Sequence, residues 1–267
     1  MRALEWAVVF ARKLSAPLHI FHRIESPGYL EKDVKRLSES QMAEYVREVG
    51  EKLKAIAELE LLAGLEVSTS LSGGDFIGQI EQLQSLNSFD FIVMGARGQH
   101  MEADKPMGSH AVKAVRKLGA HILIVPEAAQ PEEKIREVLF ASALNESDRP
   151  ALKWFIRLMA LFGTEEMHVM SVNTGSYFTQ PTFLMEEALE EFARLARSLE
   201  TGVRVETHFY KDNSVLDGIM AFGKEERVNL IAVPNHEKHP LKRIFLGSTV
   251  EALVQVSDAP VLCIDLH

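Results

Sequence analysis

The chain has 267 residues, 46% of them hydrophobic and 25% charged, a composition that excludes a disordered chain and allows two domains of about 130 residues. Acidic residues outnumber basic ones by 38 to 29, and the formal net charge of −9 argues against nucleic acid or an anionic membrane surface as the main partner. The single cysteine, Cys263, excludes an internal disulfide and a zinc site built from cysteines, which fits a reducing compartment.

The first expected element is a helix at the N-terminus. Apolar residues recur at helical spacing from Leu4 to Leu14, while Glu5 and Arg12 interrupt the apolar run. This pattern favours an amphipathic helix over a signal peptide. No apolar run in the sequence approaches the roughly 20 residues that a membrane span needs. We therefore expect a soluble, cytoplasmic protein.

Strand and helix patterns alternate along the first half of the chain. Short apolar runs bounded by polar residues predict strands, and apolar residues three or four apart predict helices. We expect helices over 2–14, 31–62, 76–86 and 108–118, and strands over 17–24, 65–71, 89–95 and 121–125. The polar, proline-flanked segment Pro126–Glu133 lacks periodicity, which is typical of a linker.

The second half shows the same alternation. We expect strands over 135–142, 165–172, 203–210, 229–234 and 259–264, and helices over 149–162, 184–200, 214–227 and 247–257. Strands that alternate with helices, with few hairpin signals, predict right-handed crossovers and a mostly parallel sheet with helices on both faces. The fold class is therefore α/β.

The two halves are copies of one unit, which we place at residues 1–128 (the first copy) and 133–267 (the second copy). The similarity is greatest in one helix and the strand after it, which open the first copy, and near the last helix and strand of each copy. Among the matched residues are Ala3, Leu4, Trp6, His19, Gly108 and Ser109 in the first copy and Ala151, Leu152, Trp154, His168, Gly247 and Ser248 in the second.

One element of the repeat lacks a counterpart. The strand expected over 135–142 corresponds to positions before Met1 in the first copy. In this topology that strand is central, with partners on both edges. Three explanations are open: the chain starts upstream, another segment supplies the strand, or residues are missing from the sequence. We favour the first and the third over a sheet with a gap.

The most informative stretch follows the strand expected over 89–95. Gly95, Gly98 and Gly108-Ser109 stand there at the spacing G-x2-G-x9-G-S. Glycines at a strand end let backbone amides approach an anion closely, and the free amides at a helix start favour a phosphate. The hydroxyl of Ser109 can bind a phosphate oxygen or cap the helix. Simple turn formation and helix initiation remain alternative explanations for these residues.

The glycine spacing, the element order and the tandem repeat resemble the universal stress protein family in its two-domain form, over essentially the whole chain. The resemblance implies two doubly wound, parallel five-stranded sheets of the adenine-nucleotide-hydrolase-like type, with strand order 3-2-1-4-5. It further implies that the last strands pair across a pseudo-twofold axis, and that ATP or another adenine nucleotide binds, with or without Mg²⁺. The residues it implicates in binding are Gly95, Arg97, Gly98, Gly108, Ser109 and His110.

The second copy departs from the family's pattern. Pro234 and Glu237 stand at its loop-glycine positions, and Ala143 stands where the family has an adenine-contacting aspartate. A carboxylate at Glu237 would repel phosphate, and Pro234 has no amide hydrogen to donate. We therefore expect the nucleotide site in the first copy only, with the second copy as a degenerate partner.

The sequence favours a regulatory protein of the stress response over an enzyme. It has no Ser-His-Asp arrangement, nucleophile elbow or Walker A motif. A scaffold with both sites degenerate and a weak ATPase remain alternatives. No spacing of histidines and carboxylates matches a designed metal site, so none is expected. The expected partners are the nucleotide and the other half of an intramolecular pseudo-dimer, with a homodimer as an option and with neither nucleic acid nor membrane.

Overall fold

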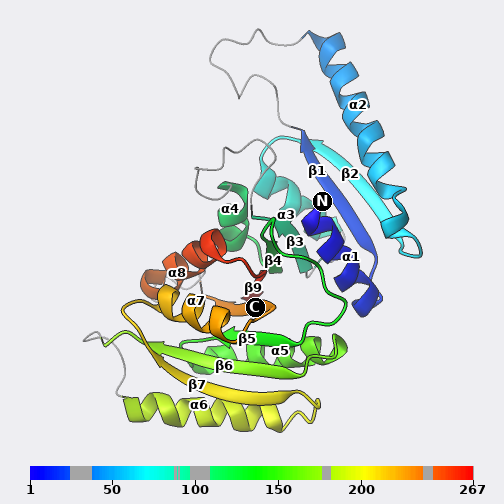
Figure 1. Ribbon diagram of the computed structural model, residues 1–267. Coiled ribbons are helices and arrows are strands. Elements are labelled where there is room, and N and C mark those ends of the chain that lie inside the picture. Colours follow the sequence, from blue (N-terminus) through cyan, green and yellow to red (C-terminus); the bar gives the residue numbers. More distant parts are fainter. Residues whose placement is uncertain are drawn as a thin grey trace. The chain divides into compact units, whose positions relative to one another are not determined.

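The structure is a computed structural model that describes residues 1–24, 38–86, 89, 91–96, 109–175, 182–236 and 243–266, with the backbone alone at 109 and 243–248. Contacts divide the chain into two compact units. The larger unit comprises Met1–Trp6 and Asp90–His267, and the smaller unit comprises Ala7–Phe89. Helices and strands alternate along the chain as predicted, and the fold is α/β (Figure 1).

The smaller unit is built on a two-stranded parallel sheet. β1 (Leu18–Ile24) pairs with β2 (Val67–Gly73), and the register sets His19 beside Ser68. Its helical elements are most of α1 (Arg2–Leu14), α2 (Glu39–Ala57), the 3-10 turn η2 (Glu60–Leu62) and α3 (Phe76–Leu86).

The helix predicted over 31–62 is shorter at its C-terminal end. Ser38 caps α2 at its start, since its hydroxyl accepts from the backbone N–H of Gln41. The helix ends at Ala57, and the extended backbone of Leu59, with ψ of 139°, separates it from η2. The predicted positions 31–37 lie outside the described residues.

The larger unit is built on a seven-stranded sheet in the order β3-β4-β9-β8-β5-β6-β7. The strands are β3 (Phe91–Gly95), β4 (His121–Val125), β5 (Glu137–Ala141), β6 (Glu166–Asn173), β7 (Arg204–Lys211), β8 (Leu230–Asn235) and β9 (Val261–Asp265). The helical elements are α4 (Ser109–Lys117), the 3-10 turn η3 (Glu146–Asp148), α5 (Arg149–Leu161), α6 (Thr182–Arg197), α7 (Val215–Glu225) and α8 (Arg243–Val256).

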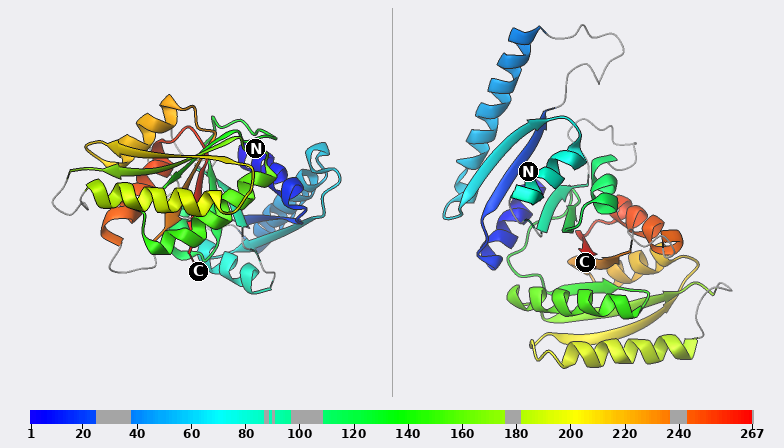
Figure 2. Two further views of the ribbon diagram at one scale, coloured as in Figure 1. Left: turned by 90° about the horizontal axis from the view of Figure 1, so that it is seen from below. Right: turned by 180° about the vertical axis from the view of Figure 1, so that it is seen from behind.

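Helices cover this sheet on both sides, and α6 and α7 flank β6 and β7 from opposite faces (Figures 1 and 2). The inner strands of the sheet, β4, β9, β8, β5 and β6, bury nearly every side chain, whereas the edge strands β3 and β7 bury few. The single cysteine, Cys263 in β9, is buried.

The order of the second copy, β7-β6-β5-β8-β9, is the predicted 3-2-1-4-5 arrangement. The last strands of the two copies pair with each other, as predicted. β4 runs antiparallel to β9, with Leu123 opposite Leu262. Through this pairing β3 and β4 of the first copy extend the sheet of the second.

The strand that the repeat lacks is also absent from the described part of the first copy. In the second copy β5 lies between β6 and β8 and pairs with both. Among the described strands of the first copy, β1 and β2 form one sheet and β3 and β4 belong to the other, with no strand in the position equivalent to β5. None of the described helices is both long enough and apolar enough to cross a membrane.

Candidate functional site

The predicted glycine loop lies between the carboxyl end of β3 and the start of α4, both in the larger unit. Gly95 is the last residue of β3, is exposed, and lies in register with Val125 at the end of β4. Ala96 continues the pairing for one residue, since its N–H donates to the Val125 carbonyl at 3.0 Å. The loop therefore leaves the sheet at the carboxyl edge, where open parallel sheets bind ligands.

The helix after the loop begins where the sequence predicts. Ser109 is the first residue of α4 and His110, half-buried, is the second. The first four backbone N–H groups of a helix have no partner within the helix, so α4 presents amides and the positive end of its dipole at this edge. An anion is the group that such an end favours.

Packing fixes α4 against the sheet of the larger unit. Ala111, Ala114 and Leu118 are buried along one face of the helix and its C-terminal end. The side-chain amide of Asn235, at the end of β8, donates to the Val115 carbonyl at 2.7 Å. These contacts hold α4 against the sheet.

Three of the six residues implicated by the resemblance, Gly95, Ser109 and His110, lie within the described part of the chain. Arg97, Gly98 and Gly108 lie outside the described residues.

The equivalent position of the second copy, at the carboxyl ends of its own strands, holds a buried polar network instead. Asp148 is 0% exposed and accepts from the Ser142 hydroxyl at 2.6 Å and from the Asn145 backbone N–H at 3.3 Å. Its other carboxylate oxygen lies 2.7 Å from Nε2 of His236, which is also buried. A carboxylate so enclosed remains buried only because these groups replace water around it. The network occupies the carboxyl end of β5 with protein side chains.

Backbone conformation supports this network. Leu144 adopts a left-handed conformation with φ of 59°, which is unfavourable for a leucine. In that conformation its N–H donates to the Ser142 hydroxyl at 2.8 Å, and this hydroxyl in turn donates to Asp148. The turn after β5 is thus shaped around Ser142 and Asp148.

The second Gly-Ser pair is placed differently from the prediction. We expected a helix over 247–257 that begins at Gly247-Ser248, but α8 begins at Arg243. The pair therefore lies inside the helix, beyond the first four residues whose amides are free. It does not present a helix start to a ligand, whereas Gly108-Ser109 stands at one.

Sequence reasoning missed the Asp148–His236 contact. The pattern Asn145-x-x-Asp148 ahead of a helix is a capping signal. It could have marked Asp148 as a residue with a backbone partner, but it carries no information on the distant His236.

Comparison with known proteins gives a consistent result. The model of the universal stress protein family matches the chain twice, over residues 1–126 and over residues 134–265. A universal stress protein from Archaeoglobus fulgidus DSM 4304 aligns with a TM-score of 0.73 and 17% identity, covering 98% of this chain and 91% of that one. A putative universal stress protein from Pseudomonas aeruginosa UCBPP-PA14 aligns with a TM-score of 0.61 and 15% identity, covering 98% and 87%.

A universal stress protein solved in complex with cAMP aligns with a TM-score of 0.41 and 15% identity, covering 50% of this chain and 99% of that one. No curated protein matches the sequence. The two family matches fall on the two copies that the internal repeat defines, and the strand order of the second copy is the one that the resemblance implies. The chain belongs to the universal stress protein family, with two copies of the family's unit in tandem.

Proposed function

We propose that the first copy binds an adenine nucleotide, ATP in the first place, through the loop that joins β3 to α4. The observation that carries the proposal is the difference between the two Gly-Ser pairs. Ser109 is the first residue of α4, while Ser248 lies within α8, which begins at Arg243. Only the first pair offers free helix amides and a dipole end to a phosphate.

The second copy supports the assignment to one site only. Its sheet edge holds the buried Asp148 carboxylate, which repels phosphate, and Pro234 in β8 provides no amide hydrogen. In this proposal Gly95, Arg97, Gly98, Gly108, Ser109 and His110 contact the nucleotide. The second copy acts as the partner that completes the sheet through β9.

Nucleotide occupancy then changes the surface that the loop presents. A ligand shifts a protein between states only by binding one state better than the other. We propose that the occupied and empty loops differ in this way and that a stress-response partner distinguishes them. Hydrolysis is not required for such a role.

A thermal unfolding scan with and without ATP and Mg²⁺ tests the proposal. A ligand at 100 times its dissociation constant adds about 2.7 kcal/mol to the stability of the protein it binds. This corresponds to a rise in Tm of several degrees for a domain of this size. An unchanged Tm at millimolar ATP would contradict the proposal.

Three variants, two of them a matched pair, locate the site. Gly98→Glu is expected to abolish the ATP-dependent rise in Tm, and Ser109→Ala to reduce it. Ser248→Ala, the equivalent change in the second copy, is expected to leave the rise unchanged. Equal effects of Ser109→Ala and Ser248→Ala would remove the assignment to the first copy.

A scaffold without nucleotide binding is the second candidate. The observation that favours it is the sheet of the first copy: β1 pairs only with β2 among the described strands, so the strand equivalent to β5 is not in place. The family resemblance implies that an aspartate at the end of that strand contacts the adenine. The absence of any ATP-dependent change in Tm would favour the scaffold.

A further inference from the structure

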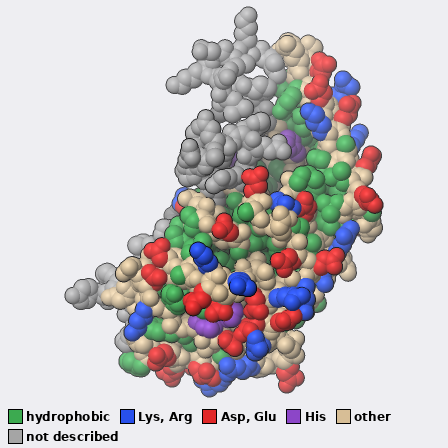
Figure 3. All heavy atoms as spheres, viewed as in Figure 1, with side chains coloured by type: hydrophobic (Ala, Val, Ile, Leu, Met, Phe, Trp, Pro, Cys, Tyr) green, Lys and Arg blue, Asp and Glu red, His purple; other side chains and the backbone are tan. Residues whose placement is uncertain are grey.

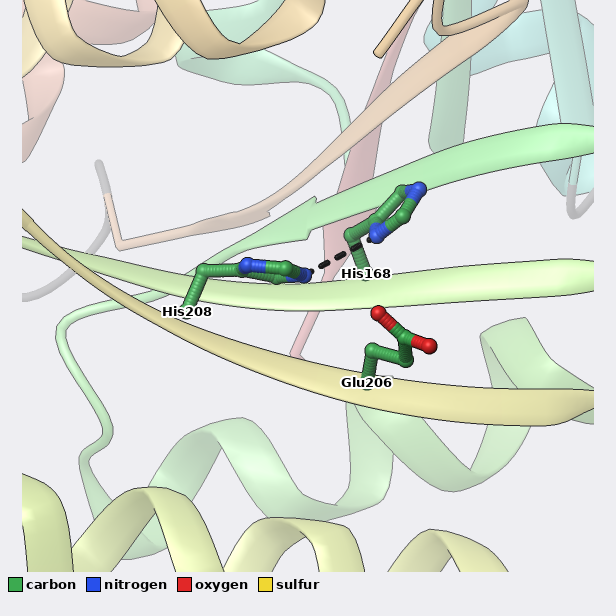
Figure 4. A group of neighbouring side chains, drawn as sticks. All are labelled: His168, Glu206 and His208. Carbon is green, nitrogen blue, oxygen red and sulfur yellow. Dashed lines mark hydrogen bonds between the residues drawn. The ribbon is translucent and has the colours of Figure 1, made fainter.

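Three side chains with metal-ligating atoms meet on one face of β6 and β7 in the second copy. They are His168, Glu206 and His208, whose ligand atoms all lie within 4.8 Å of one another. Nδ1 of His168 and Nε2 of His208 are 3.0 Å apart. Figure 4 shows the two rings facing each other, with the Glu206 carboxylate reaching toward the gap between them.

Strand register brings these residues together. β6 and β7 are parallel, and His168 lies beside Glu206 while Met170 lies beside His208. Side chains two apart on a strand share a face, so both histidines and the glutamate project from the same side. Phe222 of α7 packs over this side, with its ring centroid 5.3 Å from that of His168 and 4.6 Å from that of His208. Phe222 therefore restricts the movement of both imidazole rings.

The spacing of the two nitrogens suits an ion. Two imidazole nitrogens bound to one Zn²⁺ at 2.0–2.1 Å with tetrahedral angles lie about 3.3 Å apart. The observed 3.0 Å is only slightly shorter, so a small rotation of either ring opens the space. Glu206 is half-exposed, with 50% of its side chain accessible. It can move onto an ion without leaving a buried position.

Glu137 of β5 lies beside the buried histidine. Its carboxylate oxygen lies 3.4 Å from Nε2 of His168, whose side chain is 4% exposed. Metal-bound histidines usually direct their second ring nitrogen toward a carboxylate or carbonyl, which fixes the tautomer and raises the basicity of the ligating nitrogen. With Nε2 turned to Glu137, Nδ1 of His168 is the atom presented to His208.

The charges around the cluster favour a cation. Glu137 and Glu206 adjoin the histidines, and Glu226 acts on His208 through its charge. The guanidinium of Arg204 pairs with Glu166 and lies 3.9 Å from Glu206. The carboxylates of Glu137, Glu206 and Glu226 therefore act on the two histidines. Figure 3 shows histidine atoms at the surface in the lower half of the view, bordered by acidic and basic side chains.

The first copy shows what this position looks like without ligands. His19 corresponds to His168 in the repeat, and it lies beside Ser68 in β2 as His168 lies beside Glu206. Its two ring nitrogens contact the hydroxyls of Ser68 at 2.8 Å and Ser70 at 2.7 Å. A histidine on this strand is therefore satisfied by serines in one copy. In the other copy a carboxylate and a second imidazole replace them.

We propose that the second copy binds Zn²⁺ through Nδ1 of His168, Nε2 of His208 and the carboxylate of Glu206, with water in the remaining position and Glu137 orienting His168. In the metal-free pair one of the two facing nitrogens carries a hydrogen and donates it to the other. On binding, that hydrogen moves to the second nitrogen of the same ring, so both facing lone pairs reach the ion. This site is independent of the nucleotide site proposed above.

Titration of the dialysed, tag-free full chain with Zn²⁺ in competition with a chromophoric chelator tests the proposal. We expect one equivalent to bind, and Co²⁺ in its place to give the visible absorption bands of a four-coordinate ion. Glu137→Gln is expected to weaken Zn²⁺ binding by about 10- to 100-fold, as is typical when an orienting carboxylate is removed. His208→Gln and Glu206→Gln remove a ligand, and each is expected to abolish the Co²⁺ bands.

His19→Gln is the matched control, because it changes the equivalent histidine of the first copy, and it is expected to leave Zn²⁺ binding unchanged. Glu206→Gln is nearly isosteric and half-exposed, so its effect cannot be ascribed to unfolding. A thermal scan of each metal-free variant checks this directly. Undiminished Zn²⁺ affinity in both ligand variants would overturn the proposal, as would a wild-type chain that gives no Co²⁺ bands.

Discussion

Asp148 and His236 meet at the carboxyl edge of the second copy, with Oδ1 and Nε2 2.7 Å apart and side-chain exposures of 0% and 1%. Removing the carboxylate leaves the buried groups that contact it, among them the Ser142 hydroxyl, without a partner, at a cost of about 1–3 kcal/mol for each. We therefore expect Asp148→Ala to lower the free energy of unfolding by at least about 2 kcal/mol, as measured by urea denaturation. Glu146→Gln, two residues earlier and exposed, is expected to change it by less than about 1 kcal/mol. Similar losses in the two variants would show that the buried contact does not stabilise the fold.

Gly218 in α7 packs directly on β6. A Cβ added there would lie 2.9 Å from Cγ1 of Val172, closer than side chains pack, so Gly218→Ala forces the helix away from the strand. Overpacking of this kind costs about 1–3 kcal/mol. Gly223, one and a half turns along the same helix, has only Ile231 near, at 3.7 Å, so Gly223→Ala is expected to stabilise by up to about 1 kcal/mol.

A double-mutant cycle tests whether the clash with Val172 causes the loss of stability in Gly218→Ala. Val172→Ala removes the methyl groups that the new Cβ would meet, so it is expected to offset much of the loss caused by Gly218→Ala. Urea midpoints of the two single variants and of the double variant give the coupling. Strict additivity of the two losses would contradict the predicted clash.

His19 links the stability of the smaller unit to pH. Burial lowers the pKa of His19 below its ordinary value of 6.5. Between the two pKa values the unfolded chain binds more protons than the folded one, so the stability from the neutral imidazole is complete above about pH 6.5 and is lost as the pH falls. We expect a lower Tm on acidification from pH 7 to 5, and a smaller decrease in His19→Gln. His22 is an exposed histidine of the same strand, so the Tm of His22→Gln is expected to fall on acidification as much as that of the wild type.

Substitution of the two equivalent tryptophans, Trp6 and Trp154, is expected to lower the stability of the protein to different extents. Trp6 is 1% exposed, and its indole N–H donates to the Ala129 carbonyl at 3.2 Å. Trp154 is half-buried and stacks on His121, with ring centroids 3.9 Å apart. Trp6→Phe loses a buried hydrogen bond, at about 1–3 kcal/mol, whereas Trp154→Phe keeps an aromatic ring against His121. Chemical denaturation should therefore rank Trp6→Phe as the less stable variant, and the opposite ranking would contradict this view.

Much of the fold follows from local patterns. Apolar runs and helical spacing predicted each described strand and α-helix, though not the 3-10 turns η2 and η3, because each of these elements buries one continuous face. The errors lie where tertiary structure prevails over propensity. Gly247-Ser248 suggested a helix start, yet α8 continues one turn further toward the N-terminus, and a glycine inside a helix is tolerated at a cost of about 1 kcal/mol.

The candidate sites also differ in whether their residues are close together in the sequence. The glycine loop is local in sequence, so its spacing and the start of α4 at Ser109 could be predicted. His168 and His208 are 40 positions apart, as their numbers show, and they meet only through the register of β6 on β7. Strand alternation places Glu206 and His208 on one face, but no periodicity reveals which residue of another strand lies beside them. The Asp148–His236 contact was missed for the same reason.

The antiparallel pairing of β4 with β9 makes the two copies depend on each other for folding. Val261, Leu262 and Cys263 are almost fully buried beside β4, so residues 133–267 produced alone would expose an apolar strand with unpaired backbone groups. Such a fragment would be expected to cover β9 with a second copy of itself or to aggregate. Cleavage of the intact chain between Pro126 and Glu133, by contrast, would leave two pieces held together by a shared sheet. A gene duplication that fused two such units would thus have replaced pairing between separate molecules by pairing within one.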